Sequence, residues 1–78
     1  MATKWTAARR RRALDAGHAL PGDPPRYPIS DCDDVRNAVG DLGRSDEEDR
    51  GEIRAFITRR AIELGCTEDL PDDWRIRG

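Results

Sequence analysis

The sequence of 78 residues predicts an all-α fold: a small three-helix domain with a helical hairpin and a Pro-rich extended arm. Three observations predict it. Apolar residues recur at helical spacing in two segments, capping residues and glycines bound the expected helices, and prolines cluster before the hairpin. We expect a single domain over residues 1–78, because a chain of this length builds only one core.

The first expected element is a basic N-terminal helix within residues 1–17. Thr6 is a suitable N-cap, because its hydroxyl can accept a hydrogen bond from a backbone N–H group at the helix start. The helix is expected to run from Ala7 to Ala16, and Gly17 suits the position after a helix end. A helix this short is unstable alone in water, so it must pack against the rest of the chain.

Residues 18–29 form the expected Pro-rich arm. Four of the five prolines lie here: Pro21, Pro24, Pro25 and Pro28. Proline favours extended backbone in the preceding residue, which predicts extended conformations at Asp23, Pro24 and Tyr27. We interpret the arm as a stiff spacer that holds Leu20, Tyr27 and Ile29 on the helices. A recognition peptide for an aromatic groove is the alternative.

The expected hairpin covers residues 30–65. Ser30 and Asp33 have the spacing of a capping box before its first helix, and Gly43 marks the end of that helix. Ser45 and Glu48 repeat the capping box before the second helix. A two-residue connection, 43–44, predicts that the two helices lie side by side.

The apolar residues of the two hairpin helices are expected to face each other and form the core. In the first helix they are Cys32, Val35, Val39 and Leu42, and in the second they are Ile53, Phe56, Ile57, Ala61 and Leu64. Gly65 ends the second helix. In the C-terminal tail, residues 66–78, Thr67 can cap a single turn through Leu70, which Pro71 ends. Trp74 is expected to fold back on the pair.

The sequence contains no pattern that indicates catalysis. His18 is the only histidine, and no serine or cysteine stands at a recognisable spacing from it. Cys32 and Cys66 lack the C-x-x-C or Cys/His spacing of a zinc site. We therefore expect no catalytic residue, metal or cofactor, and interpret both cysteines as small core residues. A disulfide between them is the alternative that the sequence leaves open.

Charge is distributed unevenly along the chain. Residues 1–26 carry six basic and two acidic side chains, whereas residues 27–52 carry three basic and nine acidic ones. Opposite patches of this kind can attract each other within one chain or between copies of it. No segment approaches the roughly 20 apolar residues of a membrane span, so we expect no membrane contact.

Six residues are the candidates for binding a partner: Arg9, Arg10, Arg11, Arg12, Arg26 and Tyr27. Four consecutive guanidinium groups could neutralise several phosphates of a nucleic acid. However, successive side chains of a helix point in different directions, and the pI of about 5.3 is acidic. Both observations favour protein carboxylates over nucleic acid as the ligand of these arginines.

Several segments, in their order along the chain, resemble a small helical domain of actinobacterial phage and prophage proteins. They are ALP at 19–21, YPI at 27–29, RNA at 36–38, RRA at 59–61 and PDDW at 71–74. The resemblance covers residues 10–74 and carries no catalytic signature. It implies a non-enzymatic structural protein of the virion, assembled in the host cytoplasm: a minor capsid or capsid-accessory protein. Its expected partner is the major capsid protein or another head protein, with self-association as a further option.

Two alternatives to a structural role remain open from the sequence. The first is a nucleic-acid-binding or regulatory module that uses Arg9–Arg12, with Arg54, Arg59 and Arg60 on the long helix as further phosphate contacts. The second is an inhibitor that binds a host protein through the acidic middle of the chain.

Overall fold

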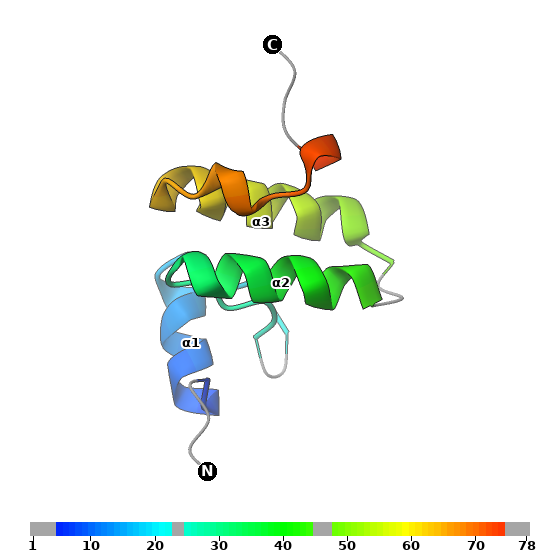
Figure 1. Ribbon diagram of the computed structural model, residues 1–78. Coiled ribbons are helices and arrows are strands. Elements are labelled where there is room, and N and C mark those ends of the chain that lie inside the picture. Colours follow the sequence, from blue (N-terminus) through cyan, green and yellow to red (C-terminus); the bar gives the residue numbers. More distant parts are fainter. Residues whose placement is uncertain (1–4, 23–24, 45–47, 75–78) are drawn as a thin grey trace.

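The computed structural model describes residues 5–22, 25–44 and 48–74, and these form an all-α fold of three helices. The helices are α1 (Ala7–Asp15), α2 (Cys32–Arg44) and α3 (Arg50–Leu64), followed by the short 3₁₀ turns η1 (Thr67–Asp69) and η2 (Asp72–Trp74). Helices α2 and α3 lie side by side in opposite directions, and α1 lies near the start of α2 (Figure 1). The predicted fold class and helical hairpin are confirmed.

Helix α1 has the predicted caps. The Thr6 hydroxyl accepts a hydrogen bond from the Arg9 backbone N–H at 3.2 Å. Gly17 has a φ of +80°, a left-handed conformation that glycine adopts without steric cost. Beyond it, the backbone N–H of Ile29 donates to the carbonyl of His18 at 2.8 Å, which ties the end of α1 to the end of the arm.

The Pro-rich segment was predicted to be an extended arm, and this is wrong for its middle part, which its own backbone closes into a loop. Leu20 and Arg26 exchange two hydrogen bonds of 2.8 Å each. As predicted, the segment holds Leu20, Tyr27 and Ile29 against the core, where Ile29 is completely buried. Asp23 and Pro24, for which we predicted extended backbone, lie outside the described residues.

Tyr27 departs from the predicted extended backbone. Its φ is +51°, the left-handed region, and it is the only described residue other than glycine with a positive φ. The residue sits between the closed loop at Arg26 and the buried Ile29. The chain must change direction sharply within these few residues, and this tertiary requirement outweighs the local effect of Pro28.

The cap of α2 lies one residue later than predicted. The Asp31 carboxylate accepts a hydrogen bond from the Asp34 backbone N–H at 2.9 Å. The Asp34 carboxylate in turn accepts hydrogen bonds from the backbone N–H and the hydroxyl of Ser30, at 2.9 and 3.0 Å. Asp34, rather than the predicted Asp33, takes this role because its side chain is buried and needs several donors.

The connection between α2 and α3 is longer than the predicted two residues. Helix α2 continues through Gly43 to Arg44, and α3 begins at Arg50 with Asp49 as its N-cap. Arg44 stays in the last turn because its cation suits a helix C-terminus and pairs with Asp41 at 3.0 Å. The expected cap Ser45 lies outside the described residues. Gly65 ends α3 as predicted, with a φ of +73°.

The core lies between α2 and α3, as predicted. Val35, Ile53 and Ile57 are completely buried, whereas Val39 and Leu64 lie at the edge of the core. Cys66 belongs to the core as predicted, and the core also includes Ala38 and Leu70, which the sequence did not assign to it. None of the described helices is long and apolar enough to cross a membrane.

The tail folds back on the hairpin. The predicted turn is η1, in which the Leu70 N–H donates to the Thr67 carbonyl at 3.1 Å. Thr67 is the first residue of this turn rather than its predicted cap, which is Cys66. A second turn, η2, follows Pro71 and was not predicted. Trp74 packs against the core as expected, and the Arg54 guanidinium lies 5.3 Å from the centre of its ring.

Candidate functional site

The four consecutive arginines of α1 do not form one surface. Arg10 is half-buried and donates a hydrogen bond to the carbonyl of Pro25 at 2.9 Å. Arg9 and Arg12 line one shallow depression, and Arg11 lines another. Successive residues of an α-helix are rotated by about 100°, which accounts for this separation.

Three of the six predicted partner-binding residues line one open groove: Arg10, Arg26 and Tyr27. This arginine groove has a volume of about 580 Å³ and lies between α1, the end of the Pro-rich segment and α2. The remaining polar side chains of its lining come from α2: Asp34, Arg36, Asn37, Asp41 and Arg44. The fold therefore adds two arginines, Arg36 and Arg44, that the sequence did not single out.

The arginines of the groove are fixed by acceptors within the chain. Arg26 forms an ion pair with Asp49 at 3.0 Å and donates a hydrogen bond to the Pro21 carbonyl at 3.0 Å. The hydrogen bond from Arg26 lowers the pKa of Asp49 below its ordinary value. Arg44 pairs with Asp41, but both side chains are largely exposed. Arg10 and Arg26 are therefore the arginines that a ligand would meet already positioned.

Two aromatic side chains, Trp5 and Tyr27, also line the arginine groove. The Trp5 indole N–H donates to the buried Asp34 carboxylate at 3.4 Å, which holds the residues before α1 on the start of α2. The left-handed backbone of Tyr27 costs on the order of 1–3 kcal/mol in a residue with a Cβ, and conformations of this kind cluster at ligand sites. The strain at Tyr27 thus marks the groove as a candidate site.

Among the described residues that line the arginine groove, there is no serine, cysteine, histidine or lysine. His18 and Ser30 share the separate depression beside Arg9, where the Ser30 hydroxyl donates its hydrogen bond to Asp34.

Arg60, one of the residues considered for phosphate contact, is buried rather than exposed. Its side chain donates two hydrogen bonds to the carbonyl of Ile29, at 3.1 and 2.9 Å, and pairs with Glu63 at 2.9 Å. The prediction that Arg60 contacts phosphate is wrong. The buried carbonyl of Ile29 needs a hydrogen-bond donor, and the Arg60 side chain supplies it. Arg54 and Arg59 remain exposed.

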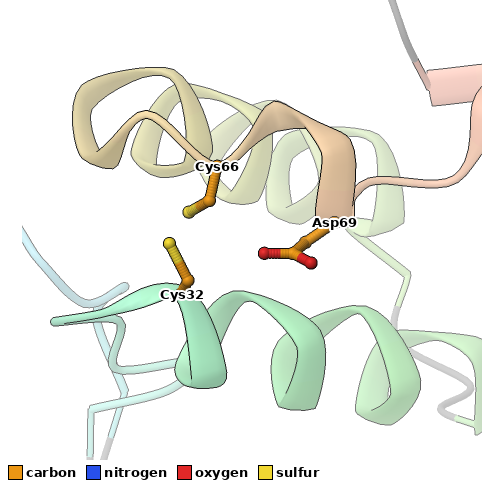
Figure 2. A group of neighbouring side chains, drawn as sticks. All are labelled: Cys32, Cys66 and Asp69. Atoms are coloured by element: carbon orange, nitrogen blue, oxygen red, sulfur yellow. The ribbon is translucent and has the colours of Figure 1, made fainter.

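A second cluster combines Cys32, Cys66 and Asp69 (Figure 2). The two sulfur atoms and one carboxylate oxygen all lie within 4.8 Å of one another. Cys32 is the first residue of α2, Cys66 follows α3, and Asp69 is the last residue of η1. Both cysteines are free thiols that belong to or pack against the core, as the sequence predicted. Their proximity was not predicted, because it depends on the antiparallel pairing of α2 and α3.

The surroundings of Cys66 disfavour its thiolate in the metal-free chain. Burial, together with the neighbouring Cys32 and Asp69, raises the pKa of the Cys66 thiol to about 11. The Asp69 carboxylate pairs with Arg36 at 3.3 Å, and Arg36 also pairs with Asp33. The guanidinium group of Arg36 thus already lies beside the Asp69 carboxylate.

Comparisons with models of protein families, with curated proteins and with solved structures find no match for this chain. The proposals below therefore rest on its residues, their geometry and the segments described in the sequence analysis.

Proposed function

We propose that the protein is a non-enzymatic structural protein of a phage, a small minor capsid or capsid-accessory protein that docks on the head shell. Its partner is the major capsid protein or another head protein, and its final location is the virion. The observation that carries the docking function is the arginine groove, with its fixed guanidinium groups and two aromatic side chains. The head as the place of docking rests on the resemblance to phage proteins.

The composition of the groove supports a protein partner. Arginine, tyrosine and tryptophan are the residues most enriched at the energetically important positions of protein interfaces. An arginine can bind a carboxylate through two parallel hydrogen bonds, which gives both affinity and orientation. Arg10, Arg26 and Arg44 line the groove together with Trp5 and Tyr27, so an acidic segment with an apolar side chain suits its composition.

The charges of the groove favour a protein over nucleic acid. Asp34 and Asp41 line it together with the arginines. A polyanion would place phosphates near both carboxylates, whereas a protein surface of mixed charge can match both signs. Repetition of a modest interface around a symmetrical shell would raise the total affinity without a large contact area per copy.

Copurification with virions tests this proposal. Arg44→Glu reverses an exposed charge in the groove, and Arg59→Glu makes the same change on α3, outside the groove. We expect the wild-type chain and Arg59→Glu to remain with density-purified virions and Arg44→Glu to be lost from them. Thermal unfolding shows whether both variants are folded. A wild-type chain absent from virions, or equal retention of both variants, would contradict the proposal.

Nucleic-acid binding is the second candidate function, and the exposure of Arg9, Arg11 and Arg12 favours it. Their separation over different depressions weakens it, because a phosphate backbone is bound most strongly by cations along one track. Steeply salt-dependent binding of DNA by the purified protein would support this candidate.

A further inference from the structure

We propose that Cys32, Cys66 and Asp69 form a binding site for a thiophilic divalent cation, with Zn²⁺ as the ion that best fits the donor set. The proposal does not depend on the function of the arginine groove. It departs from the expectation of no metal that the sequence spacing gave, because the three residues meet only in the folded chain.

The distances in the cluster are compatible with a shared metal ion. Two sulfur atoms bound to one tetrahedral zinc ion lie about 3.8 Å apart, given Zn–S bonds of about 2.3 Å. The donor atoms of the cluster lie within 4.8 Å of one another, so a shift of about 1 Å brings them to a shared ion. A disulfide would use only the two sulfur atoms, whereas a metal ion would also use the Asp69 carboxylate.

Figure 2 shows the Cys32 and Cys66 sulfurs pointing toward each other, with the Asp69 carboxylate directed at both. Two sulfur ligands select zinc and similar soft ions over magnesium and calcium. Cys32 is only partly buried and the Asp69 side chain is 19% exposed, so water can reach a fourth coordination position. Three protein ligands and one water molecule are a common zinc coordination.

A divalent cation would offset most of the negative charge of the cluster. Binding releases one proton from each thiol, and the two thiolates with the Asp69 carboxylate carry three negative charges. The metal supplies two positive charges, and Arg36, which also pairs with Asp33, lies beside the carboxylate. By pairing with Asp69, Arg36 would also orient the carboxylate, as hydrogen-bond partners of metal ligands commonly do.

The site would connect the start of α2 to the segment that follows α3. Helices α2 and α3 are connected at one end, and the cluster lies at the other, where α2 starts and α3 has ended (Figure 1). A metal there would link the first residue of α2 to Cys66, between α3 and η1, and to Asp69 of η1. Small domains with limited cores often gain stability from such a link.

Titration of the purified, fully reduced chain with Co²⁺ tests the proposal, with a phosphine reductant present throughout. Tetrahedral Co²⁺ bound to thiolates absorbs strongly in the visible range and has a sulfur-to-metal charge-transfer band. We expect both signals to saturate at one Co²⁺ per chain and to disappear when Zn²⁺ displaces it. Because two thiol protons are released, the apparent affinity should rise with pH.

Variants identify the ligands. Cys32→Ser should weaken Co²⁺ binding by about 100-fold or more and remove part of the charge-transfer band, and Asp69→Asn should weaken binding by about tenfold or more. Asp73→Asn is the matched control, because it removes the same charge from an exposed side chain of η2. Cys66 is part of the core, so its substitution would also lower the stability of the fold, and the test uses Cys32 and Asp69 instead.

Several results would overturn the metal site. They are the absence of thiolate absorption with Co²⁺, an affinity unchanged in Cys32→Ser, and equal affinities for Asp69→Asn and Asp73→Asn. A reduced chain that binds no metal, together with an oxidised chain lighter by two hydrogen atoms after treatment with glutathione disulfide, would assign the cysteines to a disulfide.

Discussion

The hairpin core can be tested by replacing a buried and an exposed isoleucine of α3, Ile57 and Ile62, by alanine and comparing the stabilities of the two variants. Both lie on α3, but Ile57 is completely buried between α2 and α3, whereas Ile62 is 56% exposed. Replacement of a buried isoleucine by alanine removes three carbon atoms from the core and leaves a cavity, at a typical cost of 2–5 kcal/mol, so we expect about that loss for Ile57→Ala. The same change at Ile62 should alter stability by about 0.5 kcal/mol or less, since alanine also favours the helix.

The size of the domain makes this difference easy to measure. A chain of this length has a free energy of unfolding of roughly 4–12 kcal/mol, so Ile57→Ala removes a large part of it. With about 4–8 °C per kcal/mol, the variant should unfold at least about 8 °C below the wild type, and Ile62→Ala within a few degrees of it. Urea unfolding followed by circular dichroism gives both free energies. Equal losses for the two variants, or no loss at Ile57, would refute the assignment of the core.

Three further predictions concern Arg60, Glu63 and His18. Arg60→Met keeps the apolar stem but removes the donors to the Ile29 carbonyl. It should lower the free energy of unfolding in urea by about 1.5–3 kcal/mol. A decrease no greater than that of Arg59→Met would contradict this role of Arg60. The hydrogen bond from Arg60 lowers the pKa of Glu63 in the folded chain below its ordinary value of 4.5. The ionised Glu63 carboxylate therefore stabilises the fold fully above pH 4.5, and this stabilisation is lost as the pH falls through the lower pKa of the folded state. The free energy of unfolding should therefore fall less steeply with acid in Glu63→Gln than in the wild type. His18→Ala should leave partner binding intact, and loss of binding by a folded variant would reveal a role for this side chain.

The features that the sequence predicted correctly depend on neighbouring residues. Thr6 caps α1 and Gly65 ends α3 because each acts on backbone groups within a few positions along the chain. The apolar spacing around Ile53 and Ile57 identifies the buried face of α3 for the same reason.

The features that the sequence missed depend on distant parts of the fold. The shift of the α2 cap to Asp31 follows from the burial of Asp34 beneath Trp5, which no local rule contains. Arg60 points inward because the end of the arm presents a carbonyl to it. In each case a polar group enclosed by tertiary structure selects its partner, and this requirement overrides the preference of the local segment.

The candidate sites also combine features that neighbouring residues determine with features that only the tertiary fold determines. The sequence shows a run of four arginines, and helix geometry predicts that their side chains diverge, but only the fold adds Arg36 and Arg44 to the groove that contains Arg10. The meeting of Cys32 with Cys66 requires the antiparallel arrangement of α2 and α3. Sequence spacing could identify the residue types of both sites, but it could not identify which of them are neighbours.

The most direct test of docking compares the binding of the purified chain to DNA-free phage heads and to double-stranded DNA, both at about 0.15 M salt. We predict saturable binding to heads, weakened when Arg9–Arg12 are replaced by glutamine, and at most weak binding to DNA. Arg10 also holds the Pro25 carbonyl, so the unfolding temperature of the variant is measured in parallel. Tight DNA binding with a steep salt dependence that flattens in the glutamine variant, together with no binding to heads, would contradict the account.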